Sequence, residues 1–364
     1  MAPSEDNCQG SAVPRPLIAI TMGDSAGIGP EIIAAAWPQA AFHRTCRPVV
    51  YGHPEILRRA VALRAPTVKV VVVEHPTDAE PTPLILPCVP VAGEEMLRIQ
   101  AGQIQAEAGR AAYEAIRAAA EAALAGKVAA VVTAPLHKEA LHLAGFHYPG
   151  HTELLADLCH VNQFAMLLYL APEPAALCPQ GLAVAHATLH IALREAIAQL
   201  SVERVLEKIR LLQQFLRWLR LETLRIGVAA LNPHGGEGGL FGDEEQRIIG
   251  PAVERAQSEG IDILGPLPAD TLFLRASEGE FQGIVAMYHD QGHIPLKLLG
   301  MHRAVNVTMG LPIIRTSVAH GTAFDIAWQG RASERSLLHA VAVAARLAMN
   351  RISCSAQSQS MVET

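Results

Sequence analysis

The sequence has no apolar run that approaches the ~18 residues needed to span a membrane. Its first sixteen residues include Glu5 and Asp6 and contain no apolar segment of the kind found in a secretory signal peptide. We therefore expect a protein that is neither exported nor embedded in a membrane, and that is located in the cytoplasm.

Basic clusters and paired cysteines are also lacking. The formal net charge is −6 and no Lys/Arg block occurs, so there is no electrostatic footprint for nucleic acid or an anionic membrane. The cysteines lack the close spacing that zinc ribbons and redox motifs require. They are Cys8, Cys46, Cys88, Cys159, Cys178 and Cys354. The sequence thus predicts reduced thiols and favours a small-molecule ligand.

What the chain does contain is an alternation of apolar runs and helical patterns. With 364 residues it is long enough for two lobes, because single cores stop growing at roughly 250 to 300 residues. Apolar, strand-like runs occur at 17–21, 48–52, 68–73, 128–133, 224–231 and 283–290. Such strands, separated by helices, indicate an α/β fold whose parallel or mixed sheet is covered on both faces. We expect the polar ends, residues 1–15 and 352–364, to be disordered.

Two helices can be predicted from periodicity. An alanine-rich segment at 102–126 closes at Gly126, and a second helix at 201–220 begins with Ser201 as a candidate N-cap. The apolar stripe of the second helix indicates packing against a core.

Residues 23–31 (GDSAGIGPE) form a glycine-rich turn between the first strand and an apolar helical segment. Glycines allow a tight turn there, and the helix N-terminus that follows favours anions. The spacing matches neither the dinucleotide fingerprint nor a Walker A loop. Taken alone, it favours a structural turn.

Three histidines, His190, His234 and His289, each lie at or near the end of an apolar, strand-like run. Three imidazoles with an open position suit Zn²⁺, Co²⁺, Mn²⁺ or Fe²⁺. Their separation alone is a weak signal in a chain with 16 histidines. A fourth, His151, follows a predicted strand by a short loop, where a helix cap is an equally good interpretation.

Other polar residues lie in loops that favour binding. The segment 235–242 is rich in glycine, which suits close approach of the backbone to a ligand, although a surface loop is nearly as plausible. Asp270 follows a proline-stiffened turn and is a candidate acid/base group or a helix cap. Lys297, Asn306 and Arg315 could form a phosphate or carboxylate clamp; ordinary surface positions are the alternative.

Eight motifs in order resemble the 4-hydroxythreonine-4-phosphate dehydrogenase family of vitamin B6 synthesis, from Leu17 to about Ala344. They are MGDSAGIGPE (22–31), TAPLHK (133–138), GHTE (150–153), ATLHIALR (187–194), LNPHGGEGGLFG (231–242), GPLPADT (265–271), YHDQG (288–292) and VNVTMGLPIIRTSVAHGTAFDIA (305–327).

The resemblance implies a two-lobed α/β fold similar to isocitrate and isopropylmalate dehydrogenases, without a Rossmann fingerprint. An outer lobe would comprise residues 16–137 and 321–351. A central lobe would comprise residues 138–320 and would carry the metal and the dimer contacts. It also implies a homodimer with the active site at the subunit interface.

The resemblance further implies the site. The matching histidines, His190, His234 and His289, would bind a divalent metal (Zn²⁺, Mg²⁺, Mn²⁺ or Co²⁺), one of them donated across the dimer. The positions expected to contact the phosphorylated substrate are His151, Thr152, Lys297, Asn306 and Arg315. The stretch 320–325 looks like a nucleotide-contacting loop, and its NAD or NADP contacts would be His320, Gly321, Thr322 and Asp325. Lys138, Asp270 and Asp290 are unranked candidates for proton transfer.

The implied reaction is NAD(P)-dependent oxidation and decarboxylation of 4-phosphohydroxy-L-threonine to 3-amino-2-oxopropyl phosphate.

Several positions depart from the pattern of the vitamin B6 enzyme, namely Ser25, Pro149 and the Trp328-Gln329 pair. Residues 289–300 look closer to paralogues that oxidise D-threonate or D-erythronate 4-phosphate. Those substrates carry a hydroxyl in place of the amine. Cis-dihydrodiol dicarboxylate dehydrogenases are a third, less favoured branch. A catalytically silent metal-binding or regulatory protein is disfavoured by retention of the three histidines and the clamp.

Overall fold

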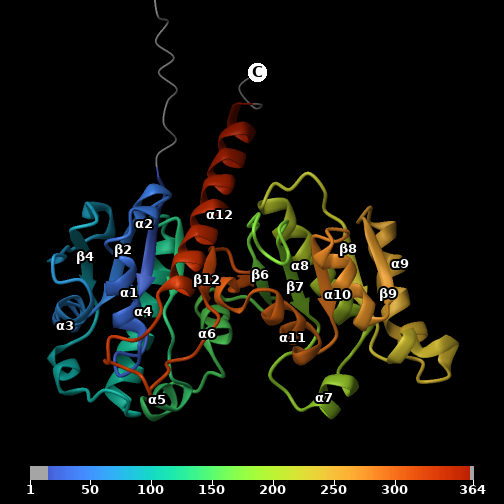
Figure 1. The fold of residues 1–364 in the computed structure, drawn as a ribbon, viewed down its shortest axis with the longest axis horizontal. Helices are drawn as coiled ribbons and strands as arrows, with labels where there is room; N and C mark the ends of the chain where they lie inside the picture. The colour runs from blue at the N-terminus through green and yellow to red at the C-terminus, as the bar shows by residue number, and fades with distance from the viewer. Residues whose placement is uncertain (1–14, 361–364) are drawn as a thin grey trace, which may run out of the picture.

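One mixed β-sheet forms the centre of the protein (Figure 1). The computed structural model describes residues 15–360, with side chains as far as Ile352. In spatial order, the strands of the sheet are β3 (Lys69–Val72), β4 (Ile85–Pro90), β2 (Arg47–Gly52), β1 (Leu17–Thr21), β5 (Ala130–Thr133), β12 (Arg315–Val318), β11 (Val305–Met309), β6 (Ala165–Leu170), β7 (Leu182–His186), β10 (Gly283–Ala286), β8 (Ile226–Ala229) and β9 (Ile263–Leu267). The predicted α/β class with a mixed sheet is confirmed.

The sheet consists of two parallel sets of strands joined by an antiparallel pair. Strands β3, β4, β2, β1, β5 and β12 run parallel to one another, and so do β7, β10, β8 and β9. Between the two sets, β11 and β6 are antiparallel to both of their neighbours. The chain direction therefore reverses in the middle of the sheet.

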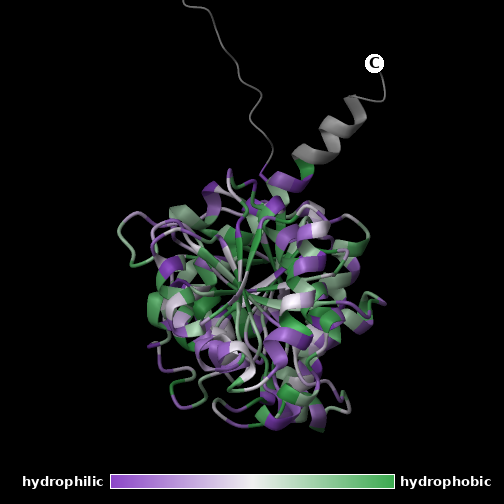
Figure 2. Cartoon of the chain, turned by 90° about the vertical axis from the view of Figure 1, so that its right-hand side faces the viewer, coloured by the Kyte–Doolittle hydropathy of each residue, from purple (hydrophilic) through white to green (hydrophobic). Residues whose placement is uncertain are grey.

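Helices cover both faces of the sheet, because alternate strand residues point to opposite sides. Ile18 and Ile20 of β1 belong to one core and Ala19 to another. The first face carries α1 (Gly29–Ala36), α3 (Pro54–Arg64), α8 (Val202–Trp218), α9 (Gly250–Ser258) and α12 (Arg335–Ser360). The second face carries α4 (Ala106–Leu124), α6 (His151–Leu158), α10 (Ala269–Ser277) and α11 (His289–Gly300). Figure 2 shows the apolar strands at the centre of this arrangement.

Short helices connect these elements. They are α2 (Ala40–Arg44), α5 (Lys138–Leu143), α7 (Leu193–Ala198), η1 (Pro76–Asp78), η2 (Glu94–Arg98), η3 (Pro233–Gly239), η4 (Glu245–Ile249) and η5 (Met301–Arg303). None of the helices within residues 15–360 combines the length and apolar character that crossing a membrane requires.

The predicted strands correspond to β1, β2, β3, β5, β8 and β10, and the two predicted helices to α4 and α8. Ser201 is the N-cap of α8, and its side chain accepts a hydrogen bond from the Arg204 amide at 3.2 Å. Two details differ. Val71 and Val72 are 43% and 48% exposed, because β3 is an edge strand, and the run at 283–290 ends as a strand at Ala286 before α11 begins.

The C-terminal prediction also needs correction. Residues 352–360, expected to be disordered, continue α12 as far as Ser360; no glycine or proline interrupts that helix. Residues 1–14 and 361–364 lie outside the described part of the chain. The lobe boundaries stay a prediction. Strands β5 and β12 pair directly with each other in the sheet, although the predicted boundaries place them in different lobes.

Candidate active site

A cavity of about 940 Å³ lies at the middle of the sheet, where the two parallel sets of strands meet. Its walls come from β5, β12, β11, β6 and β7 and from the segments that follow them. The predicted site residues that line it are Lys138, His151, Thr152, His190, His289, Lys297, Asn306, Arg315, His320 and Gly321. Folding thus gathers residues from widely separated parts of the sequence around one space.

Arg315 is the most deeply buried cation of the cavity wall, with 3% of its surface exposed. Its Nη1 donates to the Thr308 hydroxyl at 2.9 Å and its Nη2 to the Thr133 hydroxyl at 2.7 Å. Its Nε is buried and has no hydrogen-bond partner among the described residues. Burial lowers the pKa of the guanidinium to about 9, partly opposed by the negative charge of Glu153. A fixed cation with one unused donor suits an anionic ligand group.

The imidazole of His151 stands beside this cation, at the start of α6. Its Nε2 is buried without a hydrogen-bond partner among the described residues. Burial, followed by the positive charge of Arg315, holds the pKa of His151 well below its usual value. Thr152 is the next residue of α6, and a helix N-terminus favours anions through its free amides. Lys138 acts on His151 from the same end, which fits a phosphate or carboxylate, and Lys297 is a further cation in the cavity wall.

His190 and His289 face the same cavity from two different segments. Their ring centroids are 5.7 Å apart. Nδ1 of His289 lies 2.6 Å from Oδ1 of Asp290, an arrangement that orients the ring and leaves Nε2 for another partner. Burial, followed by the charge of Lys138, lowers the pKa of His190. Two imidazoles that face one cavity suit a divalent cation.

Two further histidines outside the predicted set, His186 and His293, pack next to this pair and also line the cavity. His293 lies on α11 and stacks on His289 with ring centroids 3.7 Å apart and an angle of 13° between the planes. His186 ends β7, and its Nε2 lies 3.1 Å from Nδ1 of His293. The spacing of four residues between His289 and His293 places both on one helix face and was the available signal.

His234 and Asp270 lie outside the cavity lining. His234 belongs to the glycine-rich η3 loop, has a side chain 68% exposed and pairs with Glu237 at 3.2 Å. Its φ of 53° and the 46° of Glu237 are left-handed, a strained state that functional loops often hold. Asp270 is exposed in the first turn of α10 and makes no capping bond. Within the described residues, no three His, Cys, Asp or Glu side chains come close enough to hold a metal.

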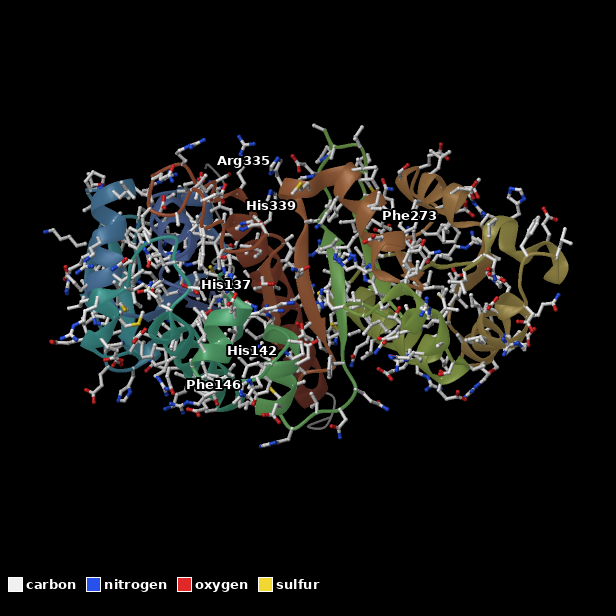
Figure 3. All side chains as sticks on the ribbon, turned by 90° about the horizontal axis from the view of Figure 1, so that it is seen from below. His137, His142, Phe146, Phe273, Arg335 and His339 are labelled. Atoms are coloured by element: carbon white, nitrogen blue, oxygen red, sulfur yellow. The ribbon has the colours of Figure 1, made fainter. Side chains whose placement is uncertain are left out.

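The segment 320–325 packs against the glycine-rich turn at 23–31. The amide of Ile28 donates to the carbonyl of Thr322 at 3.0 Å, and a Cβ on Gly27 would lie 2.9 Å from Cβ of Thr322. His137, labelled in Figure 3, stacks on Phe324 with ring centroids 4.8 Å apart. His320 and Gly321 reach the cavity from this segment, whereas Thr322 and Asp325 do not line it.

Asp24 is an unusual acid at the base of that turn. It is fully buried; its Oδ1 accepts from the Ala26 amide at 2.8 Å, and its Oδ2 has no partner among the described residues. Burial raises the pKa of Asp24 to about 6, partly opposed by the Ala26 hydrogen bond. The turn therefore holds a carboxyl group that is costly to ionise.

Comparison with known proteins relates this arrangement to a family. Residues 44–344 match the family described as pyridoxal phosphate biosynthetic protein PdxA. The chain is 48% identical over 334 residues to a D-threonate 4-phosphate dehydrogenase of Salmonella typhimurium, with 91% of this chain and 98% of that protein covered. It is 44% identical over 342 residues to a 4-hydroxythreonine-4-phosphate dehydrogenase of Trichlorobacter lovleyi, with coverage of 93% and 99%. The crystal structure of a 4-hydroxythreonine-4-phosphate dehydrogenase from Klebsiella pneumoniae superposes with a TM-score of 0.82 at 46% identity, covering 92% of this chain and 99% of that one.

Proposed function

The chain belongs to the family of the pyridoxal phosphate biosynthetic protein PdxA, a dehydrogenase family, and we propose that it oxidises a 4-phosphorylated hydroxy acid with NAD⁺ or NADP⁺. The first candidate substrate is 4-phosphohydroxy-L-threonine. Oxidation of its secondary hydroxyl and loss of CO₂ would give 3-amino-2-oxopropyl phosphate. The observation that carries the proposal is the gathering of anion-binding groups and the two imidazoles of His190 and His289 around one cavity.

The anion-binding end would hold the phosphate. Arg315 and His151 lie at this end, and Arg315 is held by two hydroxyls in the absence of a ligand. Lys297, which lines the same cavity, would add a second cation to the phosphate contacts. Thr152 and Asn306 would complete the substrate contacts. Binding energy at this remote group would orient the hydroxyl-bearing carbon near His190 and His289.

His190 and His289 would hold a divalent cation, together with His234 of a second copy of the chain. When bound, that cation supplies a Lewis acid at the hydroxyl-bearing carbon and its carboxylate neighbour. Zn²⁺, Mg²⁺, Mn²⁺ and Co²⁺ are the candidates, and two imidazole donors favour the transition metals among them. Nδ1 of His289 would donate a hydrogen bond to Oδ1 of Asp290, which would leave Nε2 as the nitrogen that coordinates the metal.

A homodimer would bring the third histidine to the cavity. Large apolar side chains are exposed on or next to elements that carry predicted site residues, a pattern typical of an interface. They are Leu193 of α7 (56% exposed), Leu240 after His234 (75%), Leu274 of α10 (60%) and Leu298 of α11 (76%). The same interface would bring Asp270 of one chain to the cavity of the other chain.

The nicotinamide cofactor would bind at the segment 320–325, through His320, Gly321, Thr322 and Asp325, where the chain meets the glycine-rich turn. Hydride would leave the hydroxyl-bearing carbon for the cofactor, and the hydroxyl proton would pass to a side chain. Lys138 is the first candidate for that proton because it lines the cavity, ahead of Asp270 and Asp290, which do not.

D-threonate or D-erythronate 4-phosphate is the second candidate substrate. The identity of 48% to a D-threonate 4-phosphate dehydrogenase, against 44% to a 4-hydroxythreonine-4-phosphate dehydrogenase, favours it.

The deciding experiment compares kcat/KM for the three 4-phosphorylated acids with purified protein, Mn²⁺ or Zn²⁺, and NAD⁺ or NADP⁺. We expect reduced nicotinamide and CO₂ in equal amounts with at least one of them. Absence of turnover with all three would refute the proposal, and the ranking of the rates would identify the substrate.

A further inference from the structure

The imidazole of His289 is held between two partners. On one side its Nδ1 meets Asp290, and on the other its ring face stacks on His293. A single hydrogen bond to an exposed aspartate does not by itself fix the plane of the ring. The stacked ring of His293, 3.7 Å away and nearly parallel, limits changes in the side-chain torsions of His289.

His293 is itself fixed by a second hydrogen-bonding network. Its Nδ1 lies 3.2 Å from the carbonyl oxygen of His289, which can only accept, and 3.1 Å from Nε2 of His186. Nδ1 of His293 therefore carries the hydrogen and donates it to both atoms, and Nε2 of His186 accepts. The assignment fixes the tautomers of both rings. His186 is 1% exposed and His293 7%, so this pair is part of the protein interior.

Gly292 shows how closely α11 approaches His186. A Cβ added at Gly292 would collide with Nε2 of His186 and would lie 2.8 Å from a methyl group of Val184. Only glycine allows the helix to lie close enough to β7 for the two imidazoles to meet. The contact between His186 and His293 thus depends on a specific residue of the helix and is not a chance approach of two side chains.

We propose that His186 and His293 are positioning residues: their hydrogen-bonded pair holds the His289 ring with its Nε2 directed into the cavity. The inference rests on the proposed function, in which His289 binds the divalent cation. His293 stacks on the ring, and His186 anchors His293 from the neighbouring strand. In this way His186 and His293 keep the His289 ring in the orientation needed for metal binding, in the absence of the metal as well.

The test measures Co²⁺ affinity by chelator competition and the visible spectrum of bound Co²⁺ in the full-length protein. Loss of an outer partner of a metal-bound histidine typically weakens metal binding about 10- to 100-fold. We expect H293L and H186L each to weaken Co²⁺ binding by this order and to change the spectrum. The double variant should bind Co²⁺ about as weakly as H293L, because the two residues act as one unit.

A matched control is available in His43, another buried histidine, which packs edge-on against Trp37 and bonds to its carbonyl at 2.7 Å. H43L removes a buried imidazole from α2, away from the cavity lining, and should lower thermal stability without changing Co²⁺ affinity or spectrum. If H293L fails to fold, H293F replaces it, since a phenyl ring keeps the stacking and loses the hydrogen bond; it should bind Co²⁺ more weakly than the parent.

Two outcomes separate this proposal from the proposed function. If H289A loses Co²⁺ binding while H293L, H293F and H186L retain the parental affinity and spectrum, the positioning role is wrong and the metal site stands. If H289A binds Co²⁺ as the parent does, the metal site itself is wrong.

Discussion

Nη2 of Arg315 donates a 2.7 Å hydrogen bond to the hydroxyl of Thr133, which lies on the parallel neighbouring strand. Together with the Thr308 hydroxyl, this bond fixes a buried cation whose Nε remains unused. The central cation of the proposed phosphate end is therefore held by strand residues, which fix side chains more rigidly than loops do.

The first prediction concerns that bond. T133V leaves a buried donor of Arg315 without a partner, which costs roughly 1 to 3 kcal/mol. Part of this cost should appear as a KM for the phosphorylated substrate raised about tenfold with little change in kcat, the result expected when uniform binding is lost. T133S should restore the parental KM. Steady-state kinetics of both variants check this.

Thr316 provides the control for T133V. It follows Arg315 on β12, but its buried hydroxyl bonds to the Ala340 carbonyl of α12 at 2.8 Å. T316V should lower the melting temperature and leave KM unchanged. If T316V and T133V raise KM equally, Thr133 has no specific role at the anion.

The sequence predicted the α/β sheet and the helices α4 and α8 because apolar periodicity is local, but it missed the longer helix α12. It missed β4, β9, β11 and β12, whose short runs carry prolines or polar residues such as Asn306 and Arg315, and it also missed the apolar run of β6. Motif resemblance identified the ten predicted residues that line the cavity. It missed His293, although the spacing of four residues from His289 was a signal, and it missed His186, because a contact between a strand end and a helix face is set by packing, which no local pattern reports. It also could not reveal that His234 lies outside the cavity of its own chain.

A second prediction follows from the separation of His234 from His190 and His289. In a heterodimer of one H234A subunit and one H289A subunit, purified through two different tags, one site retains all three histidines. By the symmetry of a shared interface, such a heterodimer should show about half of the parental activity. Each homodimer of the variants should be inactive, and chelator treatment should abolish activity until a divalent metal is returned.

The control for this experiment is a heterodimer of H190A with H289A. Both residues belong to the same cavity, so each site loses one ligand and no activity should appear. Equal activity in the two heterodimers, or full activity of the H234A homodimer, would contradict a shared site.

A third prediction tests the cofactor segment. In G27A the added methyl group would lie 2.9 Å from Cβ and carbonyl oxygen of Thr322 and 3.3 Å from the ring of Phe324. The segment 320–325 must shift, so the KM for the dinucleotide should rise several-fold. The KM for the phosphorylated acid should change much less, because Arg315 and His151 do not touch Gly27. A rise confined to the acid would contradict cofactor binding at this segment.

A fourth prediction uses the buried carboxyl of Asp24. Its pKa is raised by burial from 3.8 to about 6, so the folded state retains a proton that the unfolded chain has released. The stability that this group contributes is full below pH ~4 and is lost as the pH rises through ~6, by about 3 kcal/mol in total.

D24N keeps an acceptor for the Ala26 amide and cannot ionise. Its free energy of unfolding should therefore exceed that of the parent above pH 7, and the difference should shrink as the pH falls to 4. Urea denaturation of both proteins across this range measures the difference directly. A difference that is independent of pH would show that Asp24 does not titrate in this window. D24N is expected to gain stability even if it loses activity, because a buried acid that costs stability at neutral pH is typical of a functional site.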